Sequence, residues 1–248
     1  MNAAEYLARD GTLAVIRAGA ETQEIYVLMV DDGTILAFNG HVDLGTGIAT
    51  ALAQIVAEEL DVALAAVAMI LGDGKAGPEQ GPTIASETIQ VASKPLRSAA
   101  AQARHFLVGR AAIELGVSAD TLSVEDGVVK GEGNRQIAYT ELIRGQRHRL
   151  ILDESTAVKR VEDYRVVGRP APRVDIPAKV TGGFTYVHDM RVPFMLHGRV
   201  IRPPYVGIDS GGFVGNSLVS VDEASIAGIP GVVAVVVIRD FVGVVAER

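Results

Sequence analysis

The chain has 248 residues, and its 48% apolar and 21% charged residues provide for a sizeable core in one large domain or two ordinary ones. Its net charge of −7, without any basic block, argues against a nucleic-acid or anionic-membrane partner. The sequence contains no cysteine, which excludes disulfides and any cysteine-bound iron–sulfur cluster on this chain.

The first half of the chain reads as strands followed by helices. Short apolar segments at 12–17, 25–30 and 34–40, separated by turn residues, predict three strands. The next segment predicts a helix, because its apolar residues fall on one stripe. These residues are Ile48, Leu52, Ile55, Val56 and Leu60. We interpret Glu58 and Glu59, at the end of this helix, as a solvated face.

A further strand is predicted within 64–74, followed by a second helix from about Ser86 to about Leu115. Pro95 lies inside this helix and either kinks it or marks its boundary. The sequence at 117–133 predicts a small hairpin, with Asp-Gly as its turn.

Strands dominate the second half. They are expected at 184–190, 195–204, 217–222, 232–240 and 241–248, with one short helix at 223–231. The stretch 144–166 is the most charged part of the chain and is predicted to connect the halves. The fold class is therefore predicted as α+β, with a first domain at 1–145, a linker at 146–168 and a second domain at 169–248.

The last two predicted strands are apolar, and no later segment covers their faces. A buried sheet needs a second layer. We expect either that this chain is a piece of something larger, or that it borrows the surface of a partner.

Two glycine-rich stretches precede the predicted helices. Gly45 and Gly47 stand before the first helix, where backbone amides can meet an anionic group, although on spacing alone a tight strand-to-helix turn is the simpler explanation. The third glycine of a dinucleotide fingerprint and the G-K-[ST] of a Walker loop are both missing. The second stretch, 72–90, leads into the hydroxyl residues Thr83, Ser86 and Thr88 at the next helix start.

Three segments, "GHVDLGTGIATALAQIVAEELDV" from Gly40, "GPTIASETIQ" from Gly81 and "VVGRPAPRVDIPAKVTGGFTYVHDMRVPFMLHGRVIRPP" from Val166, resemble one family. This family comprises the molybdenum-binding subunits of the xanthine dehydrogenase/aldehyde oxidase class, and in particular its nicotinate dehydrogenase and isoquinoline oxidoreductase group. The resemblance implies a molybdopterin-binding-domain segment at 1–145 and an α/β-hammerhead domain at 169–248.

The resemblance also implies cofactor-binding residues. In the family, a G-Q-G loop and a later A-S-x-S loop hold the pterin, and they match two loops of this chain. The residues concerned are Leu44, Gly45, Thr46, Gly47, Ala85, Ser86 and Thr88. Thr46 departs from the family pattern, because glutamine usually stands there and approaches the metal, which threonine is too short to do. Either a water takes the place of the glutamine contact, or this subgroup holds the metal differently.

The implied activity is hydroxylation of an N-heteroaromatic substrate or an aldehyde with oxygen from water. The implied cofactor is molybdenum in molybdopterin, in its cytosine dinucleotide form. The implied partners are the rest of the molybdenum-binding subunit, an iron–sulfur subunit with [2Fe–2S] clusters, and a cytochrome or flavin electron acceptor. The chain is therefore expected to be inactive alone.

Several residues that suggest catalysis receive structural interpretations. His188 and Asp189 are adjacent, so in a strand they would point to opposite faces. His41 either touches the cofactor or packs half-buried. Glu132 stands in a "GE" pair, as the base does in the family, but in a polar hairpin early in the order, so no catalytic residue and no metal ligand is assigned.

Three hypotheses remain from the sequence. The first is part of a molybdenum hydroxylase, the second a non-catalytic cofactor-binding or assembly protein of the same fold, and the third an ordinary nucleotide-binding α/β domain. The N-terminus lacks a secretory signal and charged residues interrupt every apolar run, so no membrane span is expected. A cytoplasmic location is expected, with periplasmic or membrane association through partners as the alternative.

Overall fold

The structure is a computed structural model that describes residues 3–19, 23–202 and 218–248. The chain divides into two compact units, Met1–Thr181 and Gly182–Arg248. The helices of the first unit are α1 (Ala3–Ala8), α2 (Ile48–Leu60), α3 (Ser93–Leu115), α4 (Tyr139–Ile143) and α5 (Ile176–Val180). Its strands are β1 (Thr12–Ala18), β2 (Gln23–Val30), β3 (Ile35–Asn39), β4 (Val67–Leu71), β5 (Ser123–Glu125), β6 (Val128–Lys130), β7 (Gln136–Ala138) and β8 (Arg147–Ile151).

A five-stranded mixed sheet in the order β4-β3-β2-β1-β8 organises the first unit. The three central strands pair antiparallel, whereas β4 and β8 pair parallel to their neighbours at the two edges. A nucleotide-binding α/β domain would have a doubly wound, mostly parallel sheet. The third hypothesis is therefore wrong, and the predicted α+β class is confirmed.

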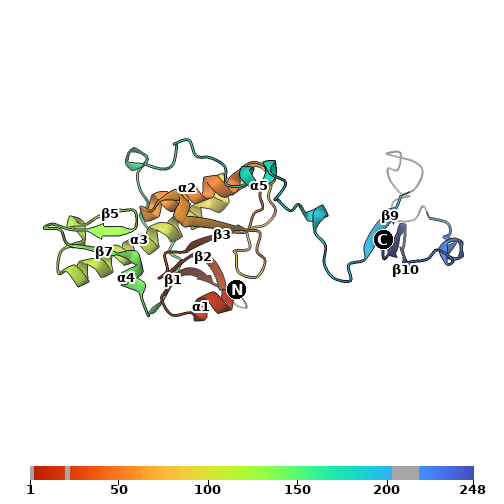
Figure 1. Cartoon of the computed structure of the whole chain (residues 1–248), viewed down its shortest axis with the longest axis horizontal. Coiled ribbons are helices and arrows are strands. Elements are labelled where there is room, and N and C mark those ends of the chain that lie inside the picture. The colour runs from red at the N-terminus through yellow and green to blue at the C-terminus, as the bar shows by residue number, and fades with distance from the viewer. Residues whose placement is uncertain (1–2, 20–22, 203–217) are drawn as a thin grey trace. The chain divides into compact units, whose positions relative to one another are not determined.

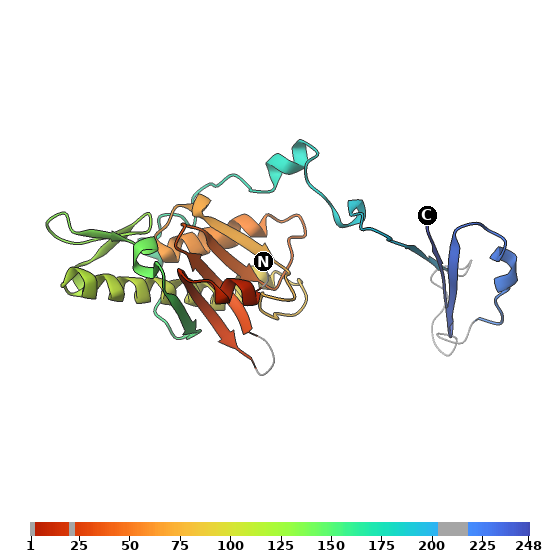
Figure 2. The ribbon, with the colours of Figure 1, turned by 60° about the horizontal axis from the view of Figure 1, so that its bottom comes forward.

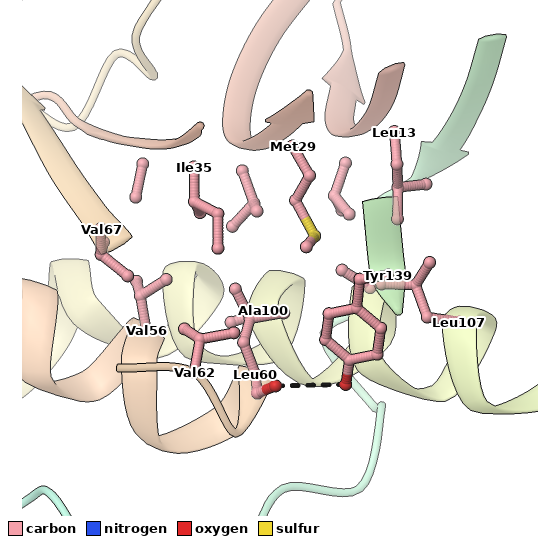
Figure 3. Packing of buried hydrophobic residues seen from close by; sticks show 14 of the residues in the cluster. Leu13, Met29, Ile35, Val56, Leu60, Val62, Val67, Ala100, Leu107 and Tyr139 are labelled. Atoms are coloured by element: carbon pink, nitrogen blue, oxygen red, sulfur yellow. Dashed lines mark hydrogen bonds between the residues drawn. The ribbon is translucent and has the colours of Figure 1, made fainter. Parts of the chain in front are cut away.

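Both faces of this sheet are covered, which explains why the central residues of β1 to β3 are apolar on both sides. Helices α2 and α3 lie side by side on one face (Figure 1, Figure 2). Figure 3 shows the core between the sheet and these helices, to which Leu13 and Met29 of the strands and Val56 of α2 belong. Residues such as Ile16, Leu28 and Phe38 point to the other face and pack with Leu7 of α1. Alternate residues of β1 and β3 therefore enter opposite cores, whereas a register shift between β1 and β2 puts Tyr26 and Val27 into the same core.

The predicted helix at 48–60 is confirmed, and its bounds follow from backbone geometry. Gly47 precedes it at φ 79° and Asp61 ends it at φ 52°, so both flanking residues are left-handed. The second predicted helix begins with a π-turn at Thr88–Ala92 and continues as α3. Pro95 falls in the first turn of α3, where its missing N–H costs nothing, so it marks a boundary.

The predicted hairpin at 117–133 is confirmed as β5 and β6, joined by Asp126 and Gly127, both with positive φ. The stretch 144–166 differs from the expected connection, because β8 adds a parallel strand to the sheet edge beside β1. The high charge of this stretch did not indicate a strand, because every second side chain of β8 is exposed and can carry a charge.

The second unit contains a three-stranded antiparallel sheet in the order β10-β11-β9. Its strands are β9 (His197–Ile201), β10 (Val232–Ile238) and β11 (Phe241–Ala246), and a 3₁₀ turn spans Glu223–Ile226. The strand expected at 184–190 is wrong, because a 3₁₀ turn at Val187–Asp189 replaces it and no strand pairs with it among the described residues. Residues 218–222 form no strand either, and Ser217 lies outside the described residues.

Candidate functional site

The loop between β3 and α2 is held by the carboxylate of Asp43. Its Oδ1 accepts the backbone N–H of Gly45 at 2.8 Å and that of Gly47 at 3.2 Å. Its Oδ2 accepts the N–H of Ala49 in the first turn of α2 at 3.4 Å. The backbone N–H groups of Gly45 and Gly47, which could have bound an external anion, are therefore bonded to Asp43 of the same chain.

Burial of Asp43 disfavours its charge, but the hydrogen bonds from Ala49, Gly45 and Gly47 together hold the pKa of its carboxyl below the ordinary value. The loop is thus a turn built around an ionised carboxylate at the N-terminus of α2. Sequence reasoning missed Asp43, although an aspartate two residues before a glycine is a recognisable turn signal.

The second predicted loop contains two successive residues in the left-handed region, Ala85 at φ 49° and Ser86 at φ 61°. Residues other than glycine seldom adopt this conformation, so this stretch of backbone is strained. Both residues are exposed, whereas Thr88, which begins the π-turn, is only 6% exposed. A strained segment followed by a π-turn is a local arrangement that frequently occurs at functional sites.

His41 joins the two loops. It is 1% exposed, and its Nδ1 lies 2.7 Å from the hydroxyl of Thr88 while its Nε2 lies 3.2 Å from the carbonyl oxygen of Gln80. Because a carbonyl only accepts, Nε2 donates, and in the neutral ring Nδ1 then accepts the Thr88 hydroxyl proton. His41 is therefore a fully buried structural residue, and the hydroxyl of Thr88 is engaged with it.

The two loops meet around a pocket of about 420 Å³. Five of the seven predicted site residues line it: Leu44, Thr46, Ala85, Ser86 and Thr88. The remaining wall is formed by Val42, Ile48, Thr83, Ile84, Ile89 and Gln90. Most of the lining is apolar, and within the described part of the chain the hydroxyls of Thr46 and Ser86 have no hydrogen-bond partner.

Gly45 and Gly47 belong to the same loop but do not line the pocket. Space around Gly45 is open, since no atom lies within 4 Å of a Cβ added there. A Cβ at Gly47 would instead lie 2.9 Å from Nε of Arg173. The group that approaches Gly47 closely is therefore a side chain of this chain, which no spacing in the sequence had indicated.

Residues 159–175, which we call the strap, run along α2 and lead into α5 (Figure 1). Glu58 anchors the strap: its Oε2 accepts three successive backbone N–H groups, from Arg165 at 2.9 Å, Val166 at 2.6 Å and Val167 at 2.9 Å. Burial disfavours the charge of Glu58, but these bonds and Lys159 together hold the pKa of its carboxyl below the ordinary value.

The interpretation of Glu58 and Glu59 as a solvated face is wrong, because each is 2% exposed. Glu59 accepts from Nε of Arg97 at 2.6 Å and from the backbone N–H of Lys159 at 3.1 Å. The ammonium of Lys159 donates to the backbone carbonyl oxygen of Glu58 and to the carboxylate of Asp61, and it lies 3.4 Å from Oε1 of Glu58. These buried carboxylates are paired, as buried charges must be, and they fix the strap against the helix.

Within the described residues, no group of three His, Asp or Glu side chains could hold a metal ion. No helix in the described ranges is long and apolar enough to cross a membrane. Glu132 is exposed between β6 and β7 and does not line this pocket. His188 and Asp189 lie in an exposed 3₁₀ turn of the second unit.

Comparison with known proteins identifies the family. A model of the molybdopterin cofactor-binding domain matches residues 9–186, which include both loops, the pocket and the strap. The chain belongs to the molybdopterin cofactor-binding domain family. This confirms the resemblance drawn from the sequence.

Two curated relatives agree with this family. A nicotinate dehydrogenase subunit of Pseudomonas putida is 60% identical over 224 residues, covering 90% of this chain and 19% of the relative. The beta chain of isoquinoline 1-oxidoreductase from Brevundimonas diminuta is 31% identical over 254 residues, covering 86% of this chain and 31% of the relative. The chain thus spans between about a fifth and a third of the length of these relatives.

Among solved structures, a reconstituted CO dehydrogenase from Oligotropha carboxidovorans matches with a TM-score of 0.43 at 20% sequence identity. The match covers 53% of this chain and 18% of that protein.

Proposed function

We propose that this chain is part of the molybdenum cofactor-binding subunit of a hydroxylase or dehydrogenase. The observation that carries the proposal is the pocket of about 420 Å³, in which the two loops of the family motif meet although about forty residues separate them in the sequence. Family membership supports the cofactor class, and the fold places the two loops side by side.

The pocket fits an organic cofactor with a flat ring and polar edges. Apolar side chains such as Leu44, Ile84 and Ile89 would cover the ring faces, and the hydroxyls of Thr46 and Ser86 would hydrogen-bond its edge. Thr88 would act indirectly, since its hydroxyl already bonds His41. Gly45 would act through the shape of the loop, since its N–H bonds Asp43 and its carbonyl oxygen bonds Arg173.

When bound, the molybdenum cofactor would supply oxygen-atom transfer from water and accept the substrate's electrons. The residues of this chain would bind the pterin, orient it and exclude water from its faces. In this proposal the metal is held through the dithiolene of the pterin. No described residue is assigned as the general base, so that group belongs to another part of the assembled enzyme.

The relatives support a substrate class and a setting. One is named a nicotinate dehydrogenase subunit and the other an isoquinoline oxidoreductase subunit, so we propose an N-heteroaromatic substrate. Aldehydes, which the family resemblance also implies, are the second class. We further propose the cytosine dinucleotide form of the cofactor, the remainder of the subunit and an iron–sulfur subunit as partners, a cytochrome or flavin as electron acceptor, and a cytoplasmic location.

A substitution that fills the pocket tests the proposal. Ser86→Phe places an aromatic ring at an exposed residue of the pocket wall with φ 61°. Asn134→Phe is the matched control, because Asn134 is also exposed, has φ 63° and lies outside the pocket. Asn134→Phe adds about 1 kcal/mol of left-handed strain, because asparagine tolerates this conformation, and Ser86→Phe adds no more, because serine is already strained there. Loss of cofactor from Ser86→Phe alone therefore cannot come from backbone strain. Gly47→Val would be a poorer test, since its side chain would collide with Arg173.

The measurement is molybdenum by mass spectrometry and pterin by fluorescence after oxidation, in the subunit purified with its partners. We expect Ser86→Phe to lose most of both and Asn134→Phe to retain them. Equal retention in the two variants would refute the pocket as the cofactor site. Full cofactor content without turnover of any heteroaromatic or aldehyde substrate would instead favour a non-catalytic assembly protein.

A further inference from the structure

The Gly45–Gly47 loop is fixed by two side chains that grip it from different directions. Asp43 takes its amide N–H groups, as described above. Its carbonyl side is taken by Arg173 of the strap, whose Nη1 donates to the carbonyl oxygen of Gly45 at 3.1 Å. Gly45 and Arg173 are 128 positions apart in the sequence, so the contact is a product of the tertiary fold.

Arg173 also packs against the loop. Its Nε, Cδ and Cζ would lie 2.9, 3.0 and 3.2 Å from a Cβ added at Gly47, so the guanidinium and the end of its stem fill the space above that residue. Gly47 is buried, with φ 79°. A glycine is needed here both for the backbone conformation and for this close approach.

Arg173 is itself held in one orientation. Asp175 binds it through two parallel hydrogen bonds, from Nε to Oδ1 at 3.0 Å and from Nη2 to Oδ2 at 2.7 Å. Asp175 also accepts from Nζ of Lys179 at 2.6 Å. Next to Arg173, the backbone N–H of Val174 donates to the buried hydroxyl of Thr50 in α2 at 3.0 Å. The side chain is therefore fixed at both ends.

The hydrogen bonds from Arg173 and Lys179 hold the pKa of the Asp175 carboxyl well below its ordinary value, so the pair is ionised at any physiological pH. A planar fork that bonds a carboxylate with two nitrogens and still has a third for a carbonyl is a property of arginine. A lysine ammonium cannot make these three contacts in the same plane.

We propose that Arg173 is a positioning residue of the cofactor site, latching the strap to the Gly45–Gly47 loop so that Leu44 and Thr46 face the pocket. The assignment of the pocket rests on the proposed function, whereas the latch itself is a property of this chain. Arg173 does not line the pocket, so it acts through the loop. Asp175 acts one step further back, by orienting Arg173.

Amide hydrogen exchange in the full chain, followed by NMR, tests the latch without any cofactor. We expect Arg173→Met to speed exchange at Gly45 and Gly47 about tenfold, because loop opening then no longer breaks a charge-assisted hydrogen bond. The amides of Val166 and Val167, held by Glu58, should keep their rates. A general loss of stability would move both groups together.

The control is Arg160→Met, on the same strap, where the arginine side chain is 72% exposed and pairs with Glu162. It should leave exchange at the loop unchanged. Arg173→Lys should give an intermediate rate at Gly45 and Gly47. Asp175→Asn should also speed exchange at Gly45 and Gly47. In the double variant with Arg173→Met, Asp175→Asn should add little to the exchange rate, because it acts through Arg173.

The latch is refuted if Arg173→Met exchanges at these glycines like the parent chain, or if Arg160→Met has the same effect. If Arg173→Met does not fold, Arg173→Lys decides, and parental exchange in that variant overturns the proposal. In the assembled enzyme, Arg173→Met should also lower pterin retention severalfold. Absence of pterin from the parent enzyme would refute the proposed function but leave the exchange result standing.

Discussion

The sharpest prediction concerns Glu58, whose buried carboxylate holds the strap through three backbone N–H groups. Glu58→Gln keeps the size and shape of the side chain but removes its charge. The amide oxygen of glutamine can still accept from Arg165, Val166 and Val167. The amide nitrogen then faces the ammonium of Lys159, which lies 3.4 Å from Oε1 in the native protein.

The expected cost follows from the number of bonds. A hydrogen bond to a charged group contributes about 1.5–3 kcal/mol and a neutral one about 0.5–1.5 kcal/mol, so each of the three bonds loses about 1 kcal/mol. Because glutamine is neutral, the variant avoids the desolvation cost of a buried charge, and this offsets part of the loss. We therefore expect the free energy of unfolding to fall by about 2–3 kcal/mol, equivalent to a Tm decrease of about 5–10 °C for a unit of this size.

The sign of the pH dependence gives an independent check. Because the folded pKa of Glu58 lies below its ordinary value of 4.5, the unfolded chain binds the proton more tightly than the folded protein does. The stability that its charge contributes is present above pH 4.5 and is lost as the pH falls through the folded pKa. The difference between Glu58→Gln and the parent should therefore be largest near neutral pH and shrink below about pH 4.

Urea denaturation at several pH values measures the effect, and hydrogen exchange locates it. The amides of Arg165, Val166 and Val167 should exchange much faster in the variant than in the parent. Glu162→Gln is the control, since this strap residue is 61% exposed and should cost less than about 0.5 kcal/mol. A cost below 1 kcal/mol for Glu58→Gln, or one that is constant with pH, would refute the reasoning.

Two further predictions concern the core and the boundary between the units. Tyr139→Phe should lower the free energy of unfolding by about 1–2 kcal/mol, because the buried hydroxyl donates to the carbonyl oxygen of Leu60 at 3.1 Å (Figure 3); urea denaturation measures it, and a neutral result would contradict the bond. Limited proteolysis should leave a resistant fragment that ends near Thr181, where the first compact unit ends, and early cleavage at 159–175 would show that the strap is not fixed.

The sequence by itself determined the elements whose signal is local. The strands β1 to β3 follow from short apolar segments between turn residues, and α2 follows from the helical spacing of its apolar residues. The Asp126–Gly127 hairpin follows from its turn residues. The motif loops around Thr46 and Ser86 were also identified from short segments, and the fold brings them to one pocket.

Only the tertiary structure decided which groups cover these elements. Glu58 and Glu59 are charged residues at the end of α2, and their sequence suggests a solvated face. They are nevertheless buried, because the backbone N–H groups of the strap, about a hundred residues later in the sequence, bond both carboxylates. Gly47 indicated a close approach without naming its partner, which is Arg173 of the same chain. Local spacing reports the period of a helix or strand, whereas burial depends on segments that are distant in the sequence, and a carboxylate can be buried when backbone N–H groups of such a segment bond it.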